Sequence, residues 1–195
     1  MGVIDPVGVI LAGGAGRRMG GVSKAELMLG GQTLLRHAED RLGPQVHTLA
    51  VNSAQPLVTP HTLITDRQPD RLGPLAGVLA GLDWAAQIGA RHIVTVAVDT
   101  PFFPCDLVPN LILAAEQSEQ GFAVAATQDG MQGTFGLWPL DLISALEAFL
   151  ADGHRKVRTF AENHAAAHAQ FPTTTPDAFF NINTPEDLTQ AERWL

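Results

Sequence analysis

Short, continuous runs of apolar residues recur along the chain and predict buried β-strands. They cover residues 7–12, 46–52, 92–99 and 122–127. The runs do not alternate with polar residues, which is typical of parallel strands that are covered on both faces. The pattern therefore predicts an open parallel sheet in the middle of the protein.

Between these runs, apolar residues recur every three or four positions, and this spacing predicts helices. Alternation of strand and helix predicts an α/β fold of three layers (α/β/α) with a Rossmann-like, mostly parallel sheet. With 195 residues and no internal repeat, we expect one domain, residues 1–195. The predicted helices cover residues 34–42, 75–86, 106–120 and 140–150, and a last one begins after Thr184, where Glu186 and Asp187 suit the positive end of a helix.

The charge of the chain limits the classes of partner. Its formal net charge of −8 argues against nucleic acid or an anionic membrane surface, because both need a basic footprint. Cys105 is the single cysteine, no signal segment precedes the first strand, and no apolar run is long enough to span a bilayer. We therefore expect a cytoplasmic protein that binds neither nucleic acid nor membrane.

The stretch "GVILAGGAGRRMGGVSK", residues 8–24, joins the first predicted strand to a glycine-rich loop with three cations. Glycines at the carboxyl end of a strand let backbone N–H groups approach phosphate oxygens. The Walker A pattern is absent, which excludes P-loop NTPases. A dinucleotide site is a weaker alternative, because Gly20 comes one position late and the second strand ends in Asn52 rather than an acid. A glycine turn without a ligand is the remaining alternative.

Polar residues at the ends of other predicted elements are further candidates for a site. Asp99 follows an apolar strand, and a carboxylate there needs hydrogen bonds or a cation. Gly73 precedes a predicted helix whose first N–H groups are free to bind an anion. Asn181 and Asn183 end a short apolar stretch. Each of these has an ordinary alternative, namely a turn or a helix cap without a ligand.

The segment "LAGGAGRRMGGVSK" resembles the signature loop of the molybdenum cofactor guanylyltransferases, the MobA family of nucleotidyltransferases. The family pattern is Leu-Ala-Gly-Gly, three variable residues, Arg-Met-Gly, and then Lys. Gly14 distinguishes it from many related cytidylyltransferases and sugar nucleotidyltransferases, which carry alanine there. The resemblance extends over five motifs from residue 8 to about residue 188. Val98 and Ser23 depart from the common family residues, but neither is an expected ligand.

The resemblance implies a nucleotide-binding part at about residues 6–105 and an acceptor-binding part at about residues 106–195. It implies that Lys24, Arg18 and Asp99 are catalytic and that Asp99 binds Mg²⁺, the expected cofactor. Expected contacts to GTP are Leu11, Ala12, Gly13, Gly14, Lys24, Asn52, Asp66 and Asp99, and expected residues on the molybdopterin side are Gly73, Gly77, Arg155, Lys156, Asn181 and Asn183.

The activity implied by the resemblance is transfer of GMP from GTP to the terminal phosphate of molybdenum-bound molybdopterin, with release of diphosphate. Expected partners are GTP, molybdopterin and proteins of molybdoenzyme maturation, and we expect a monomer. Three alternatives stay open: a molybdopterin cytidylyltransferase, a sugar- or polyol-phosphate nucleotidyltransferase, and a regulatory module that binds nucleotide without turnover.

Overall fold

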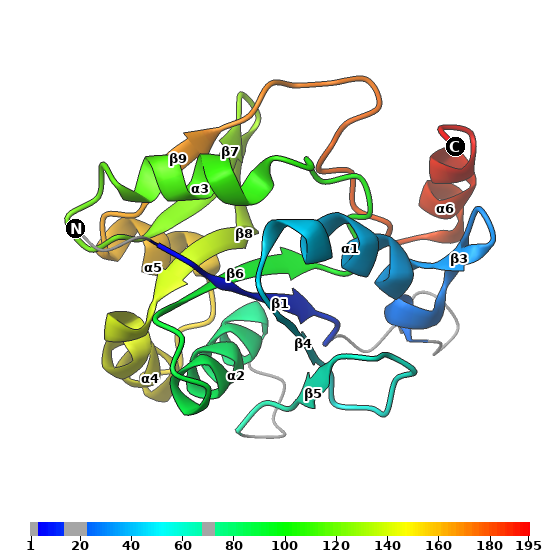
Figure 1. Cartoon of the computed structure of the whole chain (residues 1–195). Coiled ribbons are helices and arrows are strands. Elements are labelled where there is room, and N and C mark those ends of the chain that lie inside the picture. Colours follow the sequence, from blue (N-terminus) through cyan, green and yellow to red (C-terminus); the bar gives the residue numbers. More distant parts are fainter. Residues whose placement is uncertain (1–3, 14–22, 68–72) are drawn as a thin grey trace.

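A seven-stranded sheet forms the centre of the protein (Figure 1). The structure is a computed structural model, and it describes residues 4–13, 23–67 and 73–195. Its strand order is β5-β4-β1-β6-β8-β7-β9, and within the described residues β8 is the one strand antiparallel to its neighbours. The strands are β1 (Val7–Leu11), β4 (Leu49–Asn52), β5 (Thr62–Ile64), β6 (His92–Ala97), β7 (Ala123–Thr127), β8 (Gly130–Pro139) and β9 (Ala167–Gln170); β2 (Met28–Leu29) and β3 (Gln32–Thr33) form a separate hairpin.

Helices cover both faces of this sheet and complete the three layers. Apolar side chains of α1, α3 and α6 belong to the core on one face, and those of α2, α4 and α5 belong to the core on the other (Figure 1). The two cores form because successive side chains of a strand point to opposite faces: Val9 belongs to one core and Ile10 to the other. The helices are α1 (Leu34–Leu42), α2 (Pro74–Gln87), α3 (Leu107–Ala115), α4 (Ile143–Ala151), α5 (Val157–Asn163) and α6 (Pro185–Glu192), with 3₁₀ turns at Lys24–Glu26, Gly43–Gln45 and Leu140–Leu142.

The predicted α/β architecture with a mostly parallel sheet is confirmed, with differences in individual elements. The apolar runs do not predict β8, the antiparallel strand, which follows a tight turn at Gly130 (φ 128°) that reverses the chain directly after β7. The second strand begins at Leu49 rather than at residue 46, because the chain bends at residues 46 and 47 after the 3₁₀ turn at residues 43–45. The third helix ends at Ala115, where the chain passes into turns before β7.

The strand order fixes where a ligand can enter. β1 lies between β4 and β6, and the connections that lead to these two neighbours run through α1 on one face and α2 on the other. In open α/β sheets, such a change of direction leaves a crevice at the carboxyl ends of the strands, where ligands bind. The residues that follow β1, β4 and β6 are therefore the ones that line the candidate site.

The described part of the chain holds no helix with the length and hydropathy needed to cross a membrane.

Candidate active site

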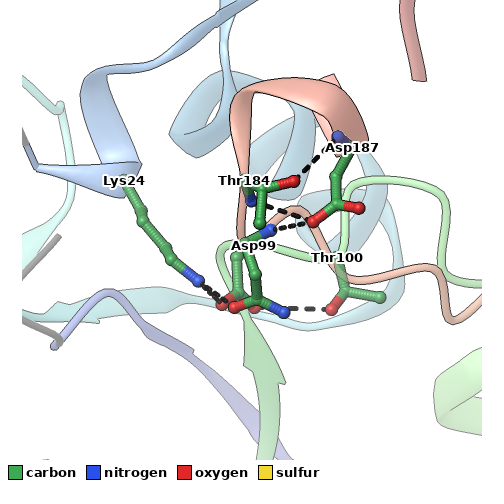
Figure 2. Close-up of polar contacts among 6 residues, drawn as sticks. Lys24, Asp99, Thr100, Thr184 and Asp187 are labelled. Atoms are coloured by element: carbon green, nitrogen blue, oxygen red, sulfur yellow. Dashed lines mark hydrogen bonds and ion pairs between the residues drawn. The ribbon is translucent and has the colours of Figure 1, made fainter. Parts of the chain in front are cut away.

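An ion pair between Lys24 and Asp99 lies at the carboxyl edge of the sheet. Lys24 begins the 3₁₀ turn after the glycine-rich loop, and Asp99 follows β6. The Lys24 Nζ donates to Asp99 Oδ2 over 2.7 Å, and both side chains are about one-fifth exposed, at 20% and 19% (Figure 2). The pair is thus partly desolvated, which strengthens its electrostatic interaction while leaving it accessible to a ligand.

Asn183 completes this cluster from the far end of the sequence. Its Oδ1 accepts a second hydrogen bond from Lys24 Nζ at 2.6 Å. The neighbouring Ile182 is fully buried, and its backbone N–H donates to the carbonyl oxygen of Asp99 at 2.8 Å. Residues predicted separately as nucleotide-side (Lys24, Asp99) and acceptor-side (Asn183) therefore meet around one ammonium group.

A second polar pair lies beside β1 on its other side. Asn52 ends β4, is 4% exposed, and donates from Nδ2 to Asp66 Oδ1 at 2.9 Å. This bond fixes the orientation of the Asn52 amide and holds the Asp66 carboxylate at the edge of the sheet. Both residues were expected to contact GTP, and the structure brings them together.

Gly77 of α2 is packed directly against Asn52. A Cβ atom at Gly77 would lie 2.5 Å from Asn52 Oδ1 and 2.9 Å from Leu11 Cδ2, closer than atoms can approach without a shift. Gly77 was predicted on the molybdopterin side, and that assignment stays a prediction. What the structure adds is a steric reason for glycine here: it leaves room for the Asn52 amide.

The end of β1 runs between the two polar clusters. The Ala12 N–H donates to the Asn52 carbonyl oxygen at 2.9 Å, and the Leu11 carbonyl oxygen accepts from Val98 N–H at 3.2 Å. A Cβ at Gly13 would lie 3.5 Å from Asn52 Oδ1, an ordinary contact. Ala12 is thus bonded to β4 on one side and Leu11 to the residue after β6 on the other, and the contacts of Leu11, Ala12 and Gly13 to GTP stay predictions.

Of the other residues predicted on the acceptor side, Gly73 and Arg155 lie close together. Gly73 begins α2 with φ 76°, and a Cβ there would be 4.0 Å from the backbone oxygen of Arg155. The Arg155 guanidinium donates to the carbonyl oxygens of Leu150 and His154, at 2.7 and 2.6 Å. Lys156 and Asn181 are exposed. A phosphate contact by Arg155 or Lys156 stays a prediction.

Two predicted site residues, Gly14 and Arg18, lie outside the described residues. The structure therefore describes the phosphate loop only up to Gly13, and again from Ser23.

Asp187 is a polar residue of the site that no motif had singled out for function. The predicted start of the last helix is confirmed, with Thr184 as N-cap and a reciprocal capping box between Thr184 and Asp187. The Asp187 Oδ2 accepts from the N–H groups of Asn183 and Thr184 at 2.9 and 2.8 Å (Figure 2). The hydrogen bond from the Asn183 N–H is the main cause of a lowered Asp187 pKa, and the Thr184 bonds and the positive charge of Lys24 add to it. The spacing of threonine and aspartate predicts the cap, but nothing in it predicts the link to Lys24.

Asp99 is the residue predicted to hold a metal ion, and that assignment stays a prediction. Its carboxylate already accepts a hydrogen bond from a cation, the Lys24 ammonium group, and the Asn183 amide oxygen accepts from the same group. No group of three or more His, Cys, Asp or Glu side chains that could hold an ion occurs among the described residues. A single carboxylate still suits Mg²⁺, which typically takes one or two carboxylates and fills its other positions with phosphate oxygens and water.

The chain is similar to known proteins in sequence and in fold. Residues 8–169 match the model of the MobA-like NTP transferase domain. The chain is 46% identical to a molybdenum cofactor guanylyltransferase of Rhizobium johnstonii, covering 96% of this chain and 92% of that protein. It is 47% identical to one of Cereibacter sphaeroides, covering 96% of both. In fold, it matches the crystal structure of molybdopterin-guanine dinucleotide biosynthesis protein A from Archaeoglobus fulgidus, with a TM-score of 0.74, 24% identity, and coverage of 96% and 97%.

Proposed function

The chain belongs to the family of MobA-like NTP transferases, and we propose that it transfers GMP from GTP to the terminal phosphate of molybdenum-bound molybdopterin. Its curated relatives, which match it over nearly the whole chain, carry the name of this activity. The structural observation that carries the proposal is the Lys24–Asp99 pair at the carboxyl edge of the sheet, joined to Asn183 from the acceptor part.

The reaction is an in-line displacement at phosphorus. A terminal phosphate oxygen of molybdopterin attacks the α-phosphorus of GTP, a new P–O bond forms, and the bond to the leaving diphosphate breaks. The nucleophile is already ionised at neutral pH, so the protein needs no strong general base. Its task is to align the two phosphates and to neutralise the charge that develops between them.

Lys24 supplies that charge in the proposed mechanism. Its ammonium group stabilises negative charge at the α-phosphate, and Asn183 aims it by accepting a hydrogen bond from Nζ. Asp99 would hold Mg²⁺, which supplies further neutralisation of the phosphate oxygens when bound. The backbone at residues 11–13 would hold the nucleotide next to these groups.

In the proposed mechanism, Asp66 and Asn52 recognise the guanine base. A carboxylate that accepts from two adjacent N–H groups matches the Watson–Crick edge of guanine, which carries N1–H and the 2-amino group. The Asn52 amide orients the Asp66 carboxylate by donating to Oδ1, which leaves the other oxygen atom and the remaining lone pairs for the base.

The decisive experiment is a matrix of nucleotides and acceptors. Purified protein is incubated with Mg²⁺ and GTP, CTP, ATP or UTP, with molybdopterin or a sugar phosphate as acceptor, and both diphosphate and the dinucleotide product are measured. Diphosphate release that requires GTP, molybdopterin and Mg²⁺ together is expected. Preference for CTP or a sugar phosphate would replace the proposal by the corresponding nucleotidyltransferase, and GTP binding without turnover would indicate a regulatory module.

Lys24→Ala and Asp99→Asn test the residues within that assay. Each removes one charge of the pair, and we expect kcat to fall about 100- to 1000-fold, the usual loss for one group that stabilises transition-state charge. Arg36→Ala is the matched control, because Arg36 is an exposed cation on α1 that pairs with Asp40 of the same helix. Turnover like that of the wild type in Lys24→Ala would remove Lys24 from the mechanism.

A further inference from the structure

The turn that precedes α6 is fixed by hydrogen bonds that a helix cap alone does not require. In the capping box, Thr184 Oγ1 accepts from Asp187 N–H at 3.1 Å, and Asp187 Oδ2 accepts from Thr184 N–H. The same Oδ2 atom also accepts from the N–H of Asn183, one residue before the helix cap. This extra bond fixes the backbone of Asn183, which lies outside the helix.

Hydrogen bonds fix the backbone at Asn183 and at the residue before it, and the Asn183 side chain points to Lys24. On one side, the buried Ile182 is bonded through its N–H to the Asp99 carbonyl oxygen at 2.8 Å. On the other, Asp187 holds the N–H of Asn183 at 2.9 Å. The Asn183 Oδ1 accepts from the Lys24 Nζ at 2.6 Å, so a hydrogen bond joins the ammonium group to this turn.

We infer that Asp187 is a positioning residue for nucleotidyl transfer: its carboxylate holds Asn183 so that the Asn183 amide oxygen aims the Lys24 ammonium group. The inference rests on the function proposed above, which gives Lys24 its role. Asp187 does not touch Lys24 through any of the hydrogen bonds described, and it acts through Asn183. Loss of the carboxylate frees Asn183 and lets the ammonium group leave its position.

The lysine content of the chain allows this link to be tested without substrate. Lys24 and Lys156 are its two lysines, so protein labelled with [ε-¹³C]lysine gives two side-chain NMR signals. Lys156 is exposed and serves as an internal reference. In Asp187→Ala we expect the Lys24 signal to move toward that of Lys156, as in Asn183→Ala, and in Asp187→Asn to move less, because the amide oxygen still accepts hydrogen bonds.

Two control variants separate positioning from helix stability and from charge. Thr184→Ala weakens the cap of α6 but leaves the Asp187 carboxylate and its bond to Asn183. Glu186→Gln removes an exposed negative charge from the first turn of the same helix. Both are expected to leave the Lys24 signal and kcat as in the wild type, although Thr184→Ala lowers the melting temperature.

Kinetics then tests the consequence for the reaction. We expect Asp187→Ala to lower kcat about tenfold, because a displacement of about 1 Å can cost up to about 100-fold in rate, with little change in the KM for GTP. The same substitution is expected to have almost no effect on kcat in an Asn183→Ala background, because its effect passes through that residue. A merely structural role would give the same loss in both backgrounds.

Several outcomes would overturn the inference. An unmoved Lys24 signal in folded Asp187→Ala or Asp187→Asn would do so, as would equal kcat losses in Thr184→Ala and Asp187→Ala. If Asp187→Ala does not fold, Asp187→Asn with the NMR signal still decides the link. Absence of any nucleotidyl transfer by the wild-type protein would contradict the proposed function instead. The NMR result does not depend on that activity, because it is measured without substrate.

Discussion

Replacing Gly77 by alanine should impair nucleotide binding through a single methyl group. The new Cβ would lie 2.5 Å from Asn52 Oδ1 and 2.9 Å from Leu11 Cδ2. The backbone of α2 tolerates alanine at this position, so the effect comes from the collision and not from backbone strain. The Asn52 amide must therefore move by close to an ångström, and it is this amide that orients Asp66.

The magnitude follows from two separate contributions. Overpacking of a tight contact costs about 1–3 kcal/mol in the free energy of unfolding, and replacing glycine by alanine inside a helix returns about 1 kcal/mol. We therefore expect a net destabilisation of about 0–2 kcal/mol. Loss of a hydrogen bond to a charged group corresponds to about 1.5–3 kcal/mol, which is about a 10- to 100-fold increase in the KM for GTP.

Gly81→Ala supplies the matched control in the same helix. Its Cβ would lie 2.9 Å from Val9 Cγ2 and 3.0 Å from Ile93 Cδ1, so it meets only the core. Urea denaturation should show both variants destabilised, whereas steady-state kinetics should show a raised KM for GTP in Gly77→Ala alone. An equal KM in the two variants would refute the idea that Gly77 makes room for the Asn52 amide.

Three further predictions concern residues outside this contact. Thr95→Val leaves the buried Trp138 Nε1 without its acceptor at 2.9 Å, and calorimetry should show a destabilisation of about 2 kcal/mol. Burial and the neighbouring Arg91 lower the pKa of His92 below its usual 6.5. As the pH falls below 6.5, the unfolded chain takes up a proton at His92 that the folded protein does not, so the free energy of unfolding falls. His92→Gln should therefore lose less unfolding free energy than the wild type between about pH 7.5 and about pH 5.5, a difference measurable by urea denaturation. Cys105 is exposed, and Cys105→Ser should retain wild-type kcat and stability within about 0.5 kcal/mol; a large loss of turnover would show that the thiol is needed.

The sequence pattern predicts the strands that lie inside the sheet and not those at its edges. Four inner strands are almost entirely buried, so their residues form continuous apolar runs in the sequence: β1, β4, β6 and β7. The edge strands β5 and β9 are three and four residues long, and β5 is mostly and β9 half exposed. Exposure removes the apolar signal on which the prediction depends. β8 has a half-exposed first half and three glycines, so its reversed direction could be read only from its pairing.

Candidate residues of the site could be recognised one at a time, but their pairing could not. Lys24 and Asn183 are 159 positions apart, and their bond depends on how α6 docks beside the end of β6. Aromatic contacts fix that docking: Trp194, just after α6, packs against Phe102 and Phe180, with ring centres 5.7 and 4.8 Å apart. No periodicity in the sequence encodes such a contact, because it follows from three-dimensional packing.

The Lys24–Asp99 pair explains how this site can hold charged groups ready without a nucleotide. Alone, each partly buried charge would lack compensation; together they neutralise one another at 2.7 Å. In the proposed reaction, phosphate oxygens would take Lys24 and a magnesium ion would take Asp99, so each new partner replaces a charge of the same sign. Separating the pair is then costly when only one of the two ligands is present, and much less so when both bind together. In that reaction the ion pair would favour joint binding of nucleotide and metal, and Asn183 would keep the ammonium group in place during the exchange.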